Sequence, residues 1–217
     1  MQSQIDTIAD CIHHRASHSA ICEAILPLLQ RVAYDPAQFV FTWHPYGFLV
    51  IRLGTYAGQT QVRLHIWPLG QRDRQQPDWP IHNHSWLLES HILCGHICDR
   101  QYQITPDSDG LHRLYTTRFE HTRSYMEATT TRAHCSSAMV RVHATGDTYA
   151  IPHGIYHSTD VDADVFATTL VLMSQPTGEP PSVLGQLSGE MQYMFERRSP
   201  PLDTTQALVT AVIAQLA

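Results

Sequence analysis

Residues 146–157 read Gly-Asp-Thr-Tyr-Ala-Ile-Pro-His-Gly-Ile-Tyr-His, and residues 82–84, much earlier in the chain, read His-Asn-His. Two histidines that are two residues apart on a strand project from the same face, so they can bind one metal ion. The Pro-x-Gly turn of the later segment allows a neighbouring strand to aim His157 at the same point. Three neutral nitrogen ligands leave coordination positions open, which is typical of a reactive metal site and not of a structural one.

The sequence from Phe39 to Gln175 surrounds these segments with short strands. The segments are rich in Val, Ile, Thr, Tyr and Phe and are separated by turn residues. The predicted strands are 39–44, 48–53, 60–67, 87–94, 96–105, 111–120, 122–130, 138–144, 148–151 and 165–174. Many short strands with no helix between them predict an all-β, antiparallel sandwich or barrel.

Helical patterns occur only at the two ends of the chain. In residues 4–32 apolar side chains recur every three or four positions, which predicts a helix, and a break near Ser17 divides it. Either Ser17 or Ser19 can cap the second part. Residues 204–216 predict a short amphipathic helix, whereas residues 185–198 show no clear pattern.

The expected organisation is one β domain with helical flanks. It consists of an N-terminal helical extension (1–36), a β-barrel (37–175) and a turn-rich segment with a helix that packs on the barrel (176–217). We expect the helical ends to cover the barrel or to build the interface of a homodimer.

Composition excludes several classes of function. The 217 residues carry a formal charge of −6, which argues against a nucleic-acid partner. All 14 basic residues are Arg, so lysine Schiff-base chemistry and a P-loop lysine are excluded. No apolar run approaches the roughly twenty residues that cross a bilayer, and the N-terminus has no signal pattern. We therefore expect a cytoplasmic protein that does not associate with membranes.

The two histidine segments resemble the two motifs of the cupin superfamily. The later segment matches well: Gly146, five residues, Pro152, one residue, Gly154, two residues and His157. Cupins usually have an Asn four positions further on, where this chain has Val161. The resemblance spans about residues 39 to 175 and implies a jelly-roll barrel, in agreement with the strand pattern.

The earlier segment departs from the cupin pattern. His82 and His84 fit, and Glu89 follows at the spacing of the carboxylate ligand, but Gln76 stands where the leading Gly is usual. Gly95 then comes one residue early. Because side chains on a strand alternate between faces, a shift of one residue exchanges the faces. Two alternatives remain: Glu89 binds the metal with the three histidines, or Leu88 takes its place and the site has three His.

The resemblance implies a metal enzyme. Cupin sites usually hold Fe(II), and Mn, Ni, Zn and Cu are alternatives because imidazole suits most of these metals. A site of three His without a carboxylate resembles that of the thiol dioxygenases, of which cysteine dioxygenase is the type. The expected partners are then a small-molecule substrate and O2.

Several side chains are candidates for the substrate pocket. On the strand 60–67, Arg63, His65 and Trp67 share one face, and Arg63 can clamp a carboxylate or a phosphate if that face points inward. The opposite orientation, toward solvent, is equally compatible with the pattern, and Arg52 shares this ambiguity.

Aromatic side chains supply further candidates. Trp79 and Trp86 flank the two histidines and can form walls of the pocket. Tyr102 and Tyr115 are the candidate phenols for hydrogen bonding to O2 or for donating a proton, and each can equally be part of hairpin packing.

Three functions are compatible with these features. The first is an Fe(II)-dependent dioxygenase acting on a small polar molecule such as an amino acid or a thiol. The second is a redox-neutral isomerase or lyase in which the metal polarises a sugar or a small acid. The third is a non-catalytic ligand-binding cupin. Dependence of turnover on O2 separates the first function from the second.

Overall fold

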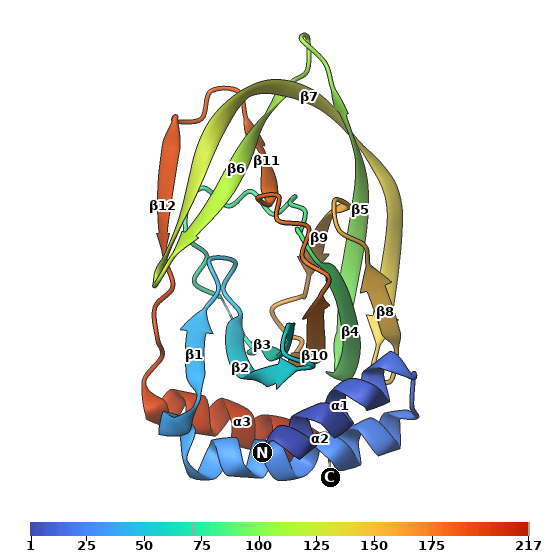
Figure 1. Ribbon diagram of the computed structural model, residues 1–217. Helices are drawn as coiled ribbons and strands as arrows, with labels where there is room; N and C mark the ends of the chain where they lie inside the picture. Colours follow the sequence, from blue (N-terminus) through green and yellow to red (C-terminus); the bar gives the residue numbers. More distant parts are fainter. Residues whose placement is uncertain (71, 217) are drawn as a thin grey trace.

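The computed structural model describes residues 1–70 and 72–216 and contains two antiparallel β-sheets and three α-helices (Figure 1). The first sheet has the strand order β1-β2-β3-β10-β4-β8. Its strands are β1 (Val40–Trp43), β2 (Leu49–Tyr56), β3 (Thr60–Trp67), β10 (Ala167–Ser174), β4 (Leu87–Cys94) and β8 (Thr148–Ile151). Every pairing in it is antiparallel. The central strand β10 pairs with β3 on one side and β4 on the other, and both are far from it in sequence.

The second sheet has the order β11-β6-β7-β5-β9, and β12 also pairs with β7. Its strands are β5 (His96–Pro106), β6 (His112–Glu120), β7 (Arg123–Ala144), β9 (Tyr156–Asp160), β11 (Ser182–Gln186) and β12 (Gln192–Glu196). In Figure 1 the long strand β7 arches over the end of the molecule that lies away from the helices. It joins into one curved strand the two segments that the sequence pattern separates.

Three helices cover the outer face of the first sheet (Figure 1). They are α1 (Gln2–His13), α2 (His18–Tyr34) and α3 (Leu202–Leu216), and a 3-10 turn, η1 (Pro36–Gln38), follows α2. The Ser17 hydroxyl caps α2 by accepting a hydrogen bond from the backbone N–H of Ala20 at 3.3 Å, as one of the two sequence alternatives predicts.

The main apolar core lies between these helices and the first sheet. Alternate residues of β3, such as Val62, Leu64 and Ile66, are fully buried there against Ile8 and Leu28. The other residues of the same strands face the second sheet. Because a strand alternates its faces, burying one set against the helices leaves the other set to line the space between the sheets.

Several expectations of the sequence are confirmed at this level. The chain is mostly β-structure in two antiparallel sheets, with helices at both ends. Strands β9, β11 and β12 have no counterpart in the sequence pattern, and the last two belong to the segment that follows residue 175. In the part of the chain that the structure describes, no helix has the length and the apolar character needed to cross a membrane. The three-segment division, the cytoplasmic location and the homodimer stay predictions.

Candidate metal centre

Backbone pairing between two distant segments creates the site. The backbone N–H of His82 donates to the carbonyl of His157 at 3.0 Å, and the N–H of His157 donates to the carbonyl of His82 at 2.8 Å. Residues that exchange both bonds in this way are directly opposite and point their side chains to the same face. His84, two residues along, therefore shares that face, and its carbonyl accepts a hydrogen bond from the N–H of Gly154 at 2.9 Å.

The backbone of His82 also bridges to Val183 of β11. The segment that carries His82 and His84 consequently lies between β9 and β11, the two edge strands of the second sheet. These two backbone bridges hold the segment in place, although the segment is not itself a strand.

The three imidazoles converge. Their ligand atoms all lie within 4.8 Å of one another, and the Nε2 atoms of His84 and His157 are 3.1 Å apart. Two nitrogens that bind one metal ion at about 2.1 Å, about 90° to 110° apart, lie about 3.0 to 3.4 Å from each other. The donor set and this separation fit a metal ion held by three imidazoles.

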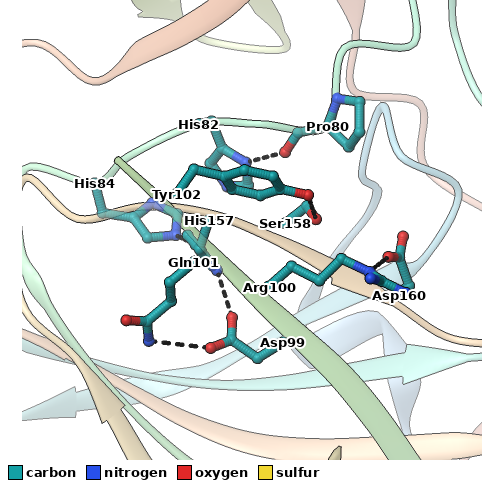
Figure 2. A network of polar contacts seen from close by, with 10 residues as sticks. All are labelled: Pro80, His82, His84, Asp99, Arg100, Gln101, Tyr102, His157, Ser158 and Asp160. Atoms are coloured by element: carbon teal, nitrogen blue, oxygen red, sulfur yellow. Dashed lines mark hydrogen bonds and ion pairs between the residues drawn. The ribbon is translucent and has the colours of Figure 1, made fainter. Parts of the chain in front are cut away.

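Polar groups behind the imidazoles orient two of them (Figure 2). The Nδ1–H of His82 donates to the carbonyl of Pro80 at 2.8 Å, and the Nδ1–H of His157 donates to Asp99 Oδ1 at 3.2 Å. Since Nδ1 carries the proton in both rings, Nε2 has its lone pair free. A carboxylate in this position also raises the basicity of the ligand.

Burial keeps two of the imidazoles neutral, which is the form that binds metals. Burial, and next the neighbouring His157, lower the pKa of His82 to about 3, while the hydrogen bond to Pro80 acts in the opposite direction. The pKa of His84 is lowered well below its ordinary value, first by burial and then by His82 and His157. A metal ion therefore meets little competition from protons here at neutral pH.

Glu89 is not brought to this centre, which corrects its expected role as a fourth ligand. Its Oε2 lies 2.8 Å from Nδ1 of His13 on α1, on the outer face of β4. Leu88 lines the inner face instead. Gly95 fixes this register, because its φ of +77° and the 2.3 Å that would separate a Cβ from the carbonyl of Phe166 exclude other residues. Relative to the usual cupin spacing, Leu88 thus takes the inner face and Glu89 the outer face. The early position of Gly95 predicts this arrangement for the alternative in which the site has three His.

A cavity of about 430 Å3 opens next to the three histidines, between the two sheets. Trp79 and Trp86 line it, as the sequence predicts, and Trp86 stacks on His84 with ring centroids 5.1 Å apart. Volumes of roughly 300 to 1,000 Å3 are typical of pockets for small molecules. The three imidazoles therefore face a space in which a small molecule fits.

The inward face of β3 is the face that carries Arg63. Arg63, His65 and Trp67 all line the cavity, and so does Arg52 on the neighbouring strand. This arrangement resolves the ambiguity of the sequence in favour of the inward orientation, and it leaves Arg63 available to a ligand.

Tyr102 lies on the opposite face of its sheet from the metal centre, which corrects its expected place in the pocket. On β5 the residue opposite His157 is Gln101, so the next residue, Tyr102, points the other way. Its hydroxyl is 3.2 Å from Ser158 Oγ, a contact visible in Figure 2. A change of one position along a strand again exchanges the faces.

Tyr115 belongs to a small core of the second sheet and does not line the cavity. It is fully buried, its ring packs behind Trp79 with centroids 5.0 Å apart, and its hydroxyl donates to the carbonyl of Glu190 at 3.2 Å. Of the two alternatives, the structure supports packing.

Other residues of the site are absent from the sequence-based prediction. Asp99, which is 2% exposed, supports His157 from a different strand, while His44, Tyr46 and Arg197 line the cavity. The Tyr46 hydroxyl donates to the carbonyl of Trp79 at 2.6 Å. The sequence marks Asp99 only as a carboxylate within a predicted strand, and Arg197 has no such signal.

Comparisons with known proteins leave the family open. No family model matches the chain, and no curated protein matches it. The DMSP lyase DddQ from Ruegeria pomeroyi DSS-3 aligns at 15% identity with a TM-score of 0.39, and the alignment covers 68% of this chain and 61%, less than two thirds, of that one.

Two further solved structures give similar values. For a cupin-like protein from Thermotoga maritima they are 17% identity, coverage of 71% of this chain and 86% of that chain, and a TM-score of 0.37. For the DMSP lyases RdDddP and RnDddQII the identity is 13%, the alignment covers 71% of this chain and 76% of that chain, and the TM-score is 0.36. Identities and TM-scores this low assign neither a family nor an activity to this chain.

Proposed function

We propose that this chain is a metal-dependent enzyme of the cupin type, and specifically an Fe(II)-dependent dioxygenase that acts on a small polar molecule such as an amino acid or a thiol. The observation that carries the proposal is the convergence of His82, His84 and His157 on one point beside a cavity of about 430 Å3. The jelly-roll barrel, with residues 1–36 and 176–217 packed against 37–175, is part of the same proposal.

The ligand set supports an oxygenase of the thiol dioxygenase type. With Glu89 on the outer face of β4, the converging ligands in the described part of the chain are three imidazoles and no carboxylate. This set matches the alternative in which the site resembles that of the thiol dioxygenases. Fe(II) held by it would supply redox chemistry with O2 beside a bound substrate. Mn, Ni, Zn and Cu remain alternatives for the same ligands.

The residues of the chain have definite tasks in this proposal. Asp99 and the carbonyl of Pro80 hold two imidazoles in the tautomer that binds metal. Trp86, stacked on His84, and Trp79 on the wall of the cavity exclude water from the centre. Arg63 on the inner face of β3 orients an anionic group of the substrate.

The test begins with elemental analysis of protein purified without oxygen, followed by O2-uptake measurements with candidate thiols and amino acids. We expect one iron per chain and O2 consumption that requires the substrate. The His157→Ala variant, which removes one ligand, should show neither. Zinc or nickel with turnover but no O2 uptake would replace the proposal by the isomerase or lyase alternative, and wild-type protein that binds no metal would overturn it.

A further inference from the structure

The cavity next to the three histidines is lined by several arginines. Within residues 1–70 and 72–216, its lining contains arginines and neutral side chains but no Asp or Glu, although the chain as a whole carries a charge of −6. The arginines are Arg52, Arg63, Arg74, Arg123 and Arg197. A positive cavity in an acidic protein attracts anions selectively.

Two of these arginines lie directly opposite each other on neighbouring strands. Arg52 of β2 pairs with Arg63 of β3, and both side chains point into the cavity. Like charges directly opposite on a sheet destabilise it. The only side-chain partner of Arg63 in the described residues is the neutral amide of Gln61, whose Oε1 accepts from Nε at 3.1 Å. An anion between the two guanidinium groups would remove the repulsion.

A third arginine reaches the same cavity from the C-terminal segment. The Nε of Arg197 is buried with no hydrogen-bond partner, while its guanidinium carbon lies 5.1 Å from the ring centroid of Phe119. Burial, and next the charge of Arg52, lower the pKa of both Arg63 and Arg197 to about 10. A buried donor without a partner destabilises the folded protein, so the site favours a ligand that accepts a hydrogen bond from it.

Four arginines form ion pairs within the described residues: Arg74, Arg100, Arg118 and Arg198. Arg74 lies 3.1 Å from Asp78, and on the outer face of the second sheet Arg100 lies 3.0 Å from Asp160. No such ion pair is found within the described residues for Arg52, Arg63 or Arg197, which we name the arginine cluster. Arg52 is exposed, so solvent has access to the cluster. Within the described residues, the three arginines of the cluster therefore face the cavity without a carboxylate partner.

We infer that the arginine cluster binds a doubly charged oxyanion group of a small molecule, either a phosphoryl group or a pair of carboxylates. Three guanidinium groups and a metal cation among neutral imidazoles leave more positive charge than one carboxylate can balance. Guanidinium groups also match the planar geometry of carboxylate and phosphoryl oxygens, with two parallel hydrogen bonds each. The inference takes this cavity as the substrate site of the proposed enzyme and thereby narrows its substrate class.

Titration calorimetry on protein freed of metal tests the inference separately from the metal chemistry. The probes are inorganic phosphate, malonate and acetate at constant ionic strength and mildly alkaline pH. We expect phosphate or malonate to bind at least about tenfold more tightly than acetate, because two charges bridge the cluster. Tighter binding of phosphate assigns a phosphoryl group, and tighter binding of malonate assigns two carboxylates. Equal binding of acetate would overturn the inference.

Variants identify the residues responsible. Arg63→Gln and Arg197→Gln should each weaken the binding of the preferred anion about tenfold or more, whereas Arg100→Gln, on the outer face, should not change it. Without anion, the melting temperature of both cavity variants should equal or exceed that of the wild type, since repulsion is removed. Phosphate or malonate should raise the melting temperature of the wild type and of Arg100→Gln more than that of the two cavity variants. Unchanged binding in both cavity variants would contradict the inference.

The same experiment separates the two proposals. In the His157→Ala variant we expect metal to be lost and anion binding to remain. Wild-type protein that binds the anion but holds no metal when it is purified without oxygen would leave this inference standing while the proposed enzyme fails. Wild-type protein that holds metal but does not prefer phosphate or malonate over acetate would do the reverse.

Discussion

Two places in this protein bring a pair of imidazoles into direct contact. At the cavity, Nε2 of His84 and Nε2 of His157 are 3.1 Å apart. Where α2 packs on β4, Nδ1 of His18 and Nε2 of His91 are 3.0 Å apart. The distances are nearly the same, but the surroundings give the two pairs different chemistry.

The pair at α2 forms a complete chain of hydrogen bonds. Nδ1 of His91 is hydrogen-bonded to the Thr148 hydroxyl at 2.8 Å, and its Nε2 is hydrogen-bonded to Nδ1 of His18. The Cys22 thiol lies 3.4 Å from Nε2 of His18. Each ring nitrogen has a neighbour that can donate or accept as required. This arrangement needs no metal ion.

The pair at the cavity is arranged differently. Asp99 holds the proton of His157 on the far side of the ring, and a third imidazole, His82, joins with its own Nδ1 occupied by a carbonyl. Among the described residues only these three imidazoles form a converging group of ligand atoms. The two pairs thus differ in the third imidazole and in the carboxylate behind His157, and not in the contact between the rings.

The largest difference between the two pairs is expected when a proposed metal ligand is removed. His82→Ala, His84→Ala or His157→Ala should each reduce the metal content from about one ion per chain to near zero, because two imidazoles alone leave the ion weakly held. His91→Gln, which alters the other pair, should retain full metal content. Elemental analysis after gel filtration checks this, and full occupancy in all three alanine variants would refute the metal centre.

Removing the support of a ligand should have a smaller effect. Asp99→Asn keeps the size of the side chain but removes the charge that orients His157, so we expect metal affinity to fall about 10- to 100-fold. Competition with a chelator of known affinity measures this. As a control, Asp160→Asn on the outer face of the second sheet should leave the affinity unchanged.

The pair at α2 should make the free energy of unfolding depend on pH. Burial, and then the neighbouring His18, lower the pKa of His91 to about 4, below its ordinary value of 6.5, while Asp147 acts in the opposite direction. Between these two pH values the unfolded chain takes up a proton that the folded chain does not. The stability contributed by neutral His91 is therefore complete above pH 6.5 and is lost as the pH falls toward 4.

Urea unfolding of metal-free protein across this pH range measures the effect. His91→Gln has no proton to take up at this position, so its free energy of unfolding should fall less steeply with decreasing pH than that of the wild type. His96→Gln, an exposed substitution on β5, serves as the control and should keep the wild-type slope. Equal slopes for His91→Gln and the wild type would show that the lowered pKa does not contribute.

The smallest effect is expected at the carboxylate that the cupin pattern would make a ligand. Glu89→Gln should change metal affinity less than about twofold, because the side chain lies on the outer face of β4 beside His13. The same competition assay measures it. A loss comparable to that of Asp99→Asn would show that Glu89 reaches the metal.

The sequence alone determined the features that depend on local spacing. Segments rich in Val, Ile, Thr, Tyr and Phe between turn residues predicted most of the strands between 39 and 175. Apolar residues at three- and four-residue spacing predicted α1, α2 and the helix at 204–216. Two histidines two residues apart share a face in any strand-like backbone, so His82 and His84 could be identified without the fold. The Pro-x-Gly turn before His157 made that residue the third candidate.

Only the tertiary structure decided the features that depend on register between distant segments. Whether Leu88 or Glu89 faces the cavity, and which way Tyr102 points, depends on single-residue shifts, because each shift exchanges the faces of a strand. Asp99 behind His157 and Arg197 beside Arg63 come from segments far apart in the sequence. Spacing along the chain carries no information about such neighbours, since they meet only when the two sheets pair and close around the cavity.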